Sequence, residues 1–156
     1  MNRVEHILVA VDFGESSQGA IETAVFLAKT FRAALTVTHT CEVPAYAYPG
    51  MAFVPMDLLT PIEDAAEKAL ANTLADVNKS VPVAKGVLRR GLAAGETLDL
   101  INEVKPDLVV VGTHGRTGVA RALLGSVAEK IVRLSPVPVL TVRADGSQHA
   151  YETARA

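Results

Sequence analysis

The stretch VVVGTHGRTGVARALLGSVAEKIV, residues 109–132, indicates most clearly how this chain folds. It opens with an apolar run typical of a strand that is buried on both faces. Gly112, Gly115 and Gly118 follow within seven residues, and a helix-start signal comes only with the Ser-x-x-Glu box that begins at Ser126. The pattern predicts a strand, a long glycine-rich turn and a helix whose N-cap is Ser126.

The same alternation of strand and helix patterns runs along the rest of the chain. The expected strands are residues 4–12, 34–40, 83–91, 107–112 and 137–142, and the expected helices are 16–31, 60–79, 93–104 and 126–135. Each connection is long enough for a crossover, and none carries a two-residue hairpin signal. We therefore expect an α/β fold with a doubly wound, five-stranded parallel sheet and helices on both faces.

Two further helix starts are expected from their capping residues. Ser16 or Ser17 is placed to cap the first helix. Thr60, followed by Pro61 and Glu63, forms the clearest capping box in the chain, with proline at the first helical position.

Length and charge limit the possible functions. The 156 residues predict one domain over residues 1–143, and the stretch 144–156 lacks periodicity and is expected to be a flexible tail. The net charge of −2 disfavours nucleic acid or an anionic membrane as the main partner. No run approaches the roughly 20 apolar residues that a membrane helix needs. The single cysteine, Cys41, suits a reducing compartment, so we expect a cytoplasmic protein.

The connection CEVPAYAYPGMAFVPMDLL, residues 41–59, does not fit the regular alternation. Three prolines interrupt it, yet it holds two of the three tyrosines and is too apolar for a solvated linker. Two interpretations remain open: the segment packs over the helices of its own domain, or it forms a lid or a surface for a partner.

The glycine-rich turn has the features of an anion site. Its glycines permit positive φ angles and a close approach of a ligand to the backbone. The amides of Gly125, Ser126 and Val127 are expected at a helix N-terminus, where free donors favour an anion, and Arg116 adds a cation. A phosphate-binding site is the interpretation we favour, and an ordinary glycine-rich crossover is the alternative. Neither a P-loop nor the dinucleotide fingerprint after the first strand is present.

Over residues 4–143 the sequence resembles the universal stress protein family. The family's nucleotide signature, Gly-x2-Gly-x9-Gly-Ser/Thr, stands here as Gly112, Gly115, Gly125 and Ser126. The segments VAVDFGESS, PDLVVVGTHGRTG and SPVPVLTVR resemble the family's first, fourth and fifth strands.

This resemblance implies a flavodoxin-like, or Rossmann-like, sheet of order 3-2-1-4-5 that binds ATP, with magnesium or manganese held through the phosphates. The implied nucleotide contacts are Ala10 and Asp12 at the adenosine, the Thr40 backbone at the adenine, Gly112 at the ribose, and Gly115, Gly125, Ser126 and Val127 at the phosphates. No carboxylate cluster in the sequence forms a metal site of its own. The preference among ATP, AMP and cyclic nucleotides stays open.

Some of these side chains also have a purely structural interpretation. Asp12 could cap the turn that follows the first strand. For His114 a structural or exposed position is favoured over acid–base chemistry, because nothing nearby in sequence orients it. His39 lies inside the second expected strand and is favoured as a hydrogen-bonded residue of the sheet. A redox role of Cys41 is disfavoured.

The fifth strand is an edge of the implied sheet and is apolar, which predicts a partner strand. Pro136 and Pro138 remove donors from one side of it. We therefore expect the odd-numbered residues of 137–141 to pair inward, and Leu140 and Val142 to offer the outward backbone groups. Antiparallel pairing with a second copy would give a homodimer through residues 137–142, which is common in the family.

Three functions of different classes are compatible with these patterns. The first is an ATP-binding regulatory protein of the stress response, acting on a protein partner that the sequence does not identify. The second is a slow ATPase that uses Arg116 and a metal ion, although no residue is a clear candidate to position the attacking water. The third is a nucleotide-free interaction module that works through residues 41–59.

Overall fold

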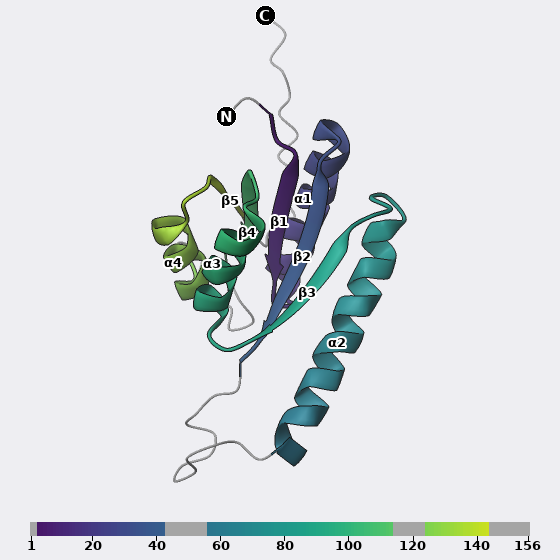
Figure 1. Ribbon diagram of the computed structural model, residues 1–156, viewed down its shortest axis with the longest axis vertical. Helices are drawn as coiled ribbons and strands as arrows, with labels where there is room; N and C mark the ends of the chain where they lie inside the picture. Colours follow the sequence, from purple (N-terminus) through teal and green to yellow (C-terminus); the bar gives the residue numbers. More distant parts are fainter. Residues whose placement is uncertain (1–2, 43–55, 114–123, 144–156) are drawn as a thin grey trace, which may run out of the picture.

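The computed structural model describes residues 3–42, 56–113 and 124–143, in which a central sheet lies between two layers of helices (Figure 1). The strands are β1 (His6–Val11), β2 (Ala34–Cys41), β3 (Lys85–Arg90), β4 (Leu108–Gly112) and β5 (Val139–Val142). The helices are α1 (Glu15–Phe31), α2 (Met56–Asn78), α3 (Ala93–Val104) and α4 (Ser126–Leu134). Most of the 41–59 connection, His114 and the expected tail 144–156 lie outside the described residues.

The sheet has the order β3-β2-β1-β4-β5, and every neighbouring pair of strands is parallel. This confirms the expected doubly wound α/β fold. Parallel neighbours need crossovers, and right-handed crossovers that run in opposite directions along a sheet place their helices on opposite faces. One core cluster accordingly joins the sheet to α1 and α2, and the other joins it to α3 and α4.

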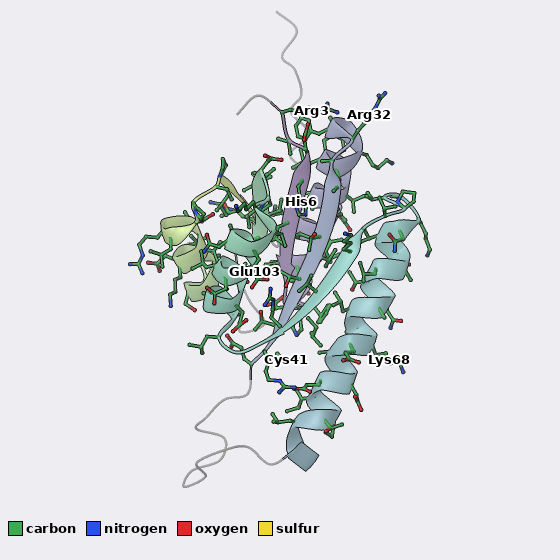
Figure 2. The ribbon with its side chains drawn as sticks, in the orientation of Figure 1. Arg3, His6, Arg32, Cys41, Lys68 and Glu103 are labelled. Atoms are coloured by element: carbon green, nitrogen blue, oxygen red, sulfur yellow. The ribbon has the colours of Figure 1, made fainter. Side chains whose placement is uncertain are left out.

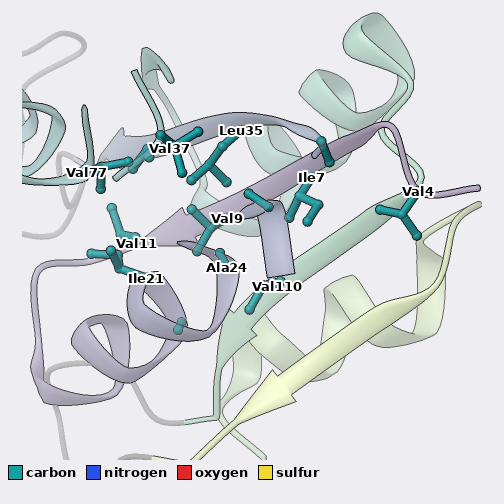
Figure 3. Close-up of a cluster of buried hydrophobic side chains, with 14 of the residues drawn as sticks. Val4, Ile7, Val9, Val11, Ile21, Ala24, Leu35, Val37, Val77 and Val110 are labelled. Carbon is teal, nitrogen blue, oxygen red and sulfur yellow. The ribbon is translucent and has the colours of Figure 1, made fainter. Parts of the chain in front are cut away.

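β1 lies at the centre of the sheet and is buried on both faces. Ile7 and Val9 belong to the core cluster on the α1 and α2 face (Figure 3), whereas Leu8 belongs to the cluster on the α3 and α4 face. All three side chains are fully buried. A strand enclosed in this way has no polar face, which explains its continuous apolar run.

α1 begins at Glu15 with Gly14 at its N-cap, and no side chain caps it. The expectation that Ser16 or Ser17 caps this helix is therefore wrong. Both serines are buried in the first turn. The Ser17 hydroxyl instead donates to Asp12 Oδ1 at 2.6 Å and accepts the Asp12 N–H at 2.8 Å. The Ser17 hydroxyl, which was expected to cap the helix, therefore hydrogen-bonds to Asp12, the residue after β1.

α2 begins at Met56 and contains Pro61 in its interior. The capping box expected from Thr60 and Glu63 is therefore wrong. Proline has a helical φ and removes only one N–H donor, so a proline one turn into a helix resembles, in sequence, a proline at the helix start. Glu63 forms an ion pair with Arg90 at the end of β3 instead.

β5 pairs with β4 in the sense opposite to the one expected. The Val109 N–H donates to the Pro138 carbonyl at 3.0 Å, and the Val142 carbonyl accepts the N–H of the residue after β4 at 2.8 Å. Backbone groups alternate in direction along a strand, so the even-numbered residues of β5 face β4, and Val139 and Thr141 face outward. The expected inward pairing of the odd-numbered residues is wrong. Proline lacks an N–H donor but keeps its carbonyl, and at the position of Pro138 only the carbonyl bonds to β4.

Asp107 ties the segment before β1 to the start of β4. Its Oδ2 accepts the N–H of Glu5 at 2.8 Å and the N–H of His6 at 2.9 Å. These two bonds, that from Glu5 first, hold the pKa of the Asp107 carboxyl below its ordinary value of 3.8, because the charged form accepts them better.

This lowered pKa predicts how stability changes with pH. A carboxyl whose pKa is lower in the folded state contributes stability above its unfolded pKa, and that contribution is lost as pH falls through the folded value. We expect Asp107→Asn to unfold at a lower urea concentration than the parent at neutral pH, with a gap that narrows below about pH 4. Urea midpoints at neutral pH and at about pH 3 measure the gap. A gap of the same size at both pH values would show that the charge is not its cause.

Candidate functional site

The strand order reverses direction between β1 and β4, and the chain leaves these two neighbours toward opposite faces of the sheet. In an open α/β sheet this reversal leaves a crevice outside the carboxyl ends of the strands. A cavity of about 820 Å³ lies at this edge, lined by the ends of β1, β2 and β4 and by residues of all four helices. Its volume is within the range of roughly 300–1,000 Å³ that is usual for ligand sites.

Seven of the nine residues expected at a nucleotide site line this one cavity. They are Ala10, Asp12, Thr40, Gly112, Gly125, Ser126 and Val127. The other two, Gly115 and Arg116, lie outside the described residues. α2 supplies a further wall that was not predicted from the sequence, on which Pro61, Ile62 and Ala65 line the cavity.

The loop between β4 and α4 is closed by backbone hydrogen bonds. Gly125 is the N-cap of α4, so the capping box expected from Ser126 and Glu129 is wrong. The Gly125 carbonyl accepts the Glu129 N–H at 2.8 Å, and the Gly125 N–H donates to the Thr113 carbonyl at 2.6 Å. The Gly125 amide is therefore engaged in closing the loop and is not the free donor that was expected.

The next three amides, those of Ser126, Val127 and Ala128, form the first turn of α4. Such amides have no acceptor within their own helix, and α4 has no side-chain cap among the described residues. All three residues line the cavity. Free donors and the positive end of the helix dipole favour an anion there. The start of α3 differs, because the Ala93 N–H donates to Glu42 Oε1 at 2.5 Å.

Asp12 lies on the cavity wall and is held by the first turn of α1. Its Oδ1 accepts the Gly14 N–H at 2.9 Å and the Ser17 hydroxyl at 2.6 Å. The structural role considered for Asp12 is therefore real, since its carboxylate stabilises the turn. A carboxylate can accept about four hydrogen bonds, so these two leave acceptor capacity for a ligand.

Phe13 has a backbone conformation that the sequence analysis missed. Its φ is 62°, in the left-handed region that bulky residues avoid. The centroid of its ring lies 4.4 Å from that of His39, with 37° between the ring planes. His39 in turn places Nδ1 2.8 Å from the Val11 carbonyl oxygen. No local sequence signal marks this arrangement, because Phe13 lies in the turn after β1 and His39 lies in β2.

Cys41 is buried on the cavity wall. Burial raises the pKa of its thiol, the Glu63 carboxylate raises it further, and Arg90 partly opposes them. The raised pKa keeps the thiol protonated at neutral pH, and a protonated thiol is a poor nucleophile and metal ligand.

Two features are absent from the described residues: a cluster of metal ligands and a helix that could span a membrane. No group of three or more His, Cys, Asp and Glu side chains there is placed to hold a metal ion. None of the helices in residues 3–42, 56–113 and 124–143 has the length and apolar character needed to cross a membrane.

The fold and the cavity define a class: a doubly wound α/β protein of flavodoxin-like topology with a cavity at the point where the strand order reverses. Within that class, the chain belongs to the universal stress protein family, whose sequence model matches residues 3–143. Universal stress protein A homolog 1 of Coxiella burnetii is 35% identical over 140 residues, which cover 88% of this chain and 95% of that protein.

Solved structures show the same fold. A universal stress protein from Lactobacillus plantarum matches with a TM-score of 0.81 and 28% identity, covering 92% of this chain and 100% of that one. A universal stress protein solved in complex with cAMP matches with a TM-score of 0.65 and 24% identity, covering 92% and 99% of the two chains. One from Archaeoglobus fulgidus in complex with dAMP matches with a TM-score of 0.62 and 19% identity, covering 88% and 97%.

Gly112 has a packing requirement that does not depend on a ligand. A Cβ at this position would lie 2.7 Å from Ser16 Oγ and 2.9 Å from the Ser16 carbonyl carbon. Because the second atom is backbone, α1 itself would have to move. We expect Gly112→Ala to lower the free energy of unfolding of the ligand-free protein by about 1–3 kcal/mol, as measured by urea denaturation.

Gly95 in α3 offers the matched control, since nothing lies within 4 Å of an added Cβ there. Gly95→Ala should raise the free energy of unfolding by about 0.5–1 kcal/mol through helix propensity. If Gly112→Ala left the ligand-free stability unchanged, the close approach to Ser16 would not explain this glycine.

Proposed function

We propose that this chain binds an adenine nucleotide, with ATP as its resident form, in the cavity at the carboxyl edge of the sheet, and that it acts as a regulatory protein of the stress response. The observation that carries the proposal is the start of α4, which lines the cavity without a side-chain cap among the described residues. The solved relatives in complex with cAMP and dAMP support adenine as the base.

The donors available at α4 fit a phosphate group. The amides of Ser126 and Val127 would bind phosphate oxygens, together with the Ser126 hydroxyl. Gly115 and Arg116 belong to the same proposal: Gly115 is part of the family signature, and Arg116 follows it as the cation of the glycine-rich segment. Magnesium or manganese would enter with the nucleotide, bound to its phosphates, and would neutralise part of their charge.

The opposite part of the cavity fits the nucleoside. Asp12 offers carboxylate acceptor capacity, and Thr40 lines the same cavity near the end of β2, where its backbone can contact the base. Ala10 and Gly112 present little side-chain bulk to the ligand, which suits close contact with the adenosine. A protein partner and a cytoplasmic location complete the proposal, the latter because the lone Cys41 suits a reducing compartment.

Ser126→Pro tests the α4 amide directly. Proline is favoured at the first helical residue, and Gly125 already has the φ of −59° and ψ of 150° that suit a residue before proline. The substitution should therefore preserve the helix while removing one N–H. A hydrogen bond to a charged group contributes about 1.5–3 kcal/mol, so we expect an affinity for Mg-ATP that is about 10- to 100-fold weaker. Isothermal titration measures the affinity, and thermal melts check the fold.

Ser126→Ala is the matched control, because it loses the hydroxyl and keeps the amide. Its affinity should lie between those of the parent and Ser126→Pro. Equal affinities of the alanine and proline variants would show that the amide does not bind the nucleotide.

The nucleotide bound by protein purified without added ligand identifies the resident form. Heat releases it, and chromatography identifies and quantifies it. Near-stoichiometric ATP would support the proposal, and AMP or cAMP in its place would contradict the preference for ATP. ADP beside ATP would favour the slow ATPase, for which single-turnover assays of Arg116→Ala are the next test. A protein that carries no nucleotide and binds none when ATP and magnesium are added would contradict nucleotide binding altogether.

We further propose that two copies associate through β5. Val139 and Thr141 turn their backbone N–H and carbonyl groups away from β4, toward the open edge of the sheet. Antiparallel pairing about a two-fold axis at Leu140 would set Val139 opposite Thr141 of the second copy. The apolar side chains of Val132 and Leu134 on α4 are 44% and 51% exposed and would be partly covered in such a dimer.

Thr141→Pro tests the open edge of β5 without removing a hydrogen bond between β5 and β4. Residue 141 has its N–H on the outward side, so proline removes a donor from the proposed interface and none from the β4 ladder. We expect sedimentation equilibrium to show a dissociation constant raised about tenfold or more, while Thr141→Val, which keeps the N–H, dimerises as the parent does. Equal dimerisation by the proline and valine variants would place the interface elsewhere.

A further inference from the structure

The turn that carries Asp12 is held by two neighbouring elements. From α1, Ser17 binds the Asp12 carboxylate and N–H, as described above. From β2, His39 makes two contacts with the residues on either side of Asp12. One is its Nδ1 contact of 2.8 Å to the Val11 carbonyl, and the other is its ring contact with Phe13.

The Val11 contact orients the His39 ring. A carbonyl oxygen only accepts hydrogen bonds, so Nδ1 carries the proton in this contact. Val11 and His39 are also direct partners in the register of β1 and β2, which fixes their separation. The ring therefore presents a fixed face to Phe13, at a centroid distance of 4.4 Å that suits a favourable aromatic pair.

Phe13 needs such a contact because of its backbone. Among the described non-glycine residues with positive φ, Arg32 and Lys105 are C-caps of α1 and α3, where left-handed backbone is common. Phe13 has no such explanation and stands on the cavity wall. A strained conformation persists only where the surrounding contacts determine it, and such strain concentrates at functional sites.

We propose that His39 is a positioning residue for the ligand site. Its ring holds Phe13 in the left-handed conformation, and that conformation brings the Gly14 N–H to Asp12 Oδ1 at 2.9 Å and so directs the carboxylate. This inference rests on the proposed nucleotide function of the cavity.

His39 acts from the face of the sheet opposite to Ala10. Phe13 packs against the core cluster on the α1 and α2 face, whereas Ala10 packs against the cluster on the α3 and α4 face, to which α4 also belongs. His39 also lines the cavity, but the effect proposed for it is transmitted through the backbone of residues 11–14 and requires no contact of its ring with the ligand.

His39→Asn tests the ring, because the asparagine amide can supply an N–H near the place of Nδ1 while the ring face is lost. We expect an affinity for Mg-ATP about three- to tenfold weaker, the size that an aromatic pair supports, with little change in the melting temperature without ligand. In the same protein, amide hydrogen exchange at Gly14 should become faster. His6→Asn is a control at the other end of the sheet, where His6 Nε2 lies 2.8 Å from the Thr36 hydroxyl oxygen. Figure 2 shows His6 far from Cys41, which lies at the carboxyl end of β2 near the cavity. It should leave the affinity unchanged.

Phe13→Gly distinguishes positioning from general packing. Glycine adopts left-handed backbone without help from a side chain, so adding His39→Asn to Phe13→Gly should cost no further affinity for Mg-ATP. Glycine and alanine both lack the ring on the cavity wall, but alanine keeps the backbone strain, so Phe13→Ala should bind more weakly than Phe13→Gly. This comparison of glycine with alanine decides the matter alone if His39→Asn fails to fold.

The outcomes separate the two proposals. Parent-like affinity and Gly14 exchange in His39→Asn would overturn the inference and leave the proposed function standing. A loss in His39→Asn that persists in the Phe13→Gly background, or equal binding by Phe13→Gly and Phe13→Ala, would also overturn it. A parent protein that binds neither ATP, AMP nor cAMP would overturn the proposed function, and the inference would fall with it.

Discussion

The structure depends on one topological constraint: β1 and β4 are parallel neighbours whose crossovers leave toward opposite faces of the sheet. Parallel strands cannot be joined by a tight turn, so each must be followed by a helix that packs back on the sheet. Because α1 and α4 diverge, the backbone opens between them at the carboxyl edge, and the cavity lies there. α1 nevertheless approaches the end of β4 so closely that Gly112 has no room for a Cβ beside Ser16. The close approach of the α1 backbone to Gly112 therefore sets the shape of the site at this point.

The helix starts at this edge differ in how their first-turn donors are satisfied. Glu42 accepts an amide at the start of α3, and at α1 the carboxylate of Asp12 accepts the Gly14 N–H and the Ser17 hydroxyl. In the described part of the chain, α4 has no comparable acidic partner, and its N-cap is a glycine without a side chain. An acidic group at a helix start satisfies the donors that a bound anion would otherwise use. Of the starts of α1, α3 and α4, that of α4 is therefore the favoured place for an anion in a protein whose net charge is −2.

The sequence predicted the elements far better than it predicted their ends. The helix expected at residues 93–104 is observed with those bounds, since its apolar period and the following Pro106 are local signals. All three expected caps were wrong. Ser17 and Glu63 have partners on other elements, and Gly125 takes the N-cap that was assigned to Ser126. A capping pattern shows that a side chain could bond to a nearby amide, but it does not show whether another group competes for that side chain.

The sequence by itself determined the class of fold, because hydrophobic period and crossover length are properties of short segments. The glycine-rich turn and the helix start after it also pointed to Gly112, Gly125, Ser126 and Val127, which line one cavity in the fold. Ala10, Asp12 and Thr40, which line the same cavity, were predicted only through the resemblance to a family. The sheet order came from the resemblance to a family and not from these patterns. Only the tertiary structure decided which polar groups are used within the fold and which remain for a ligand. The reason is physical: the partner of an amide or hydroxyl is set by the packing of separate elements, as Gly125 with Thr113 and Ala93 with Glu42 show.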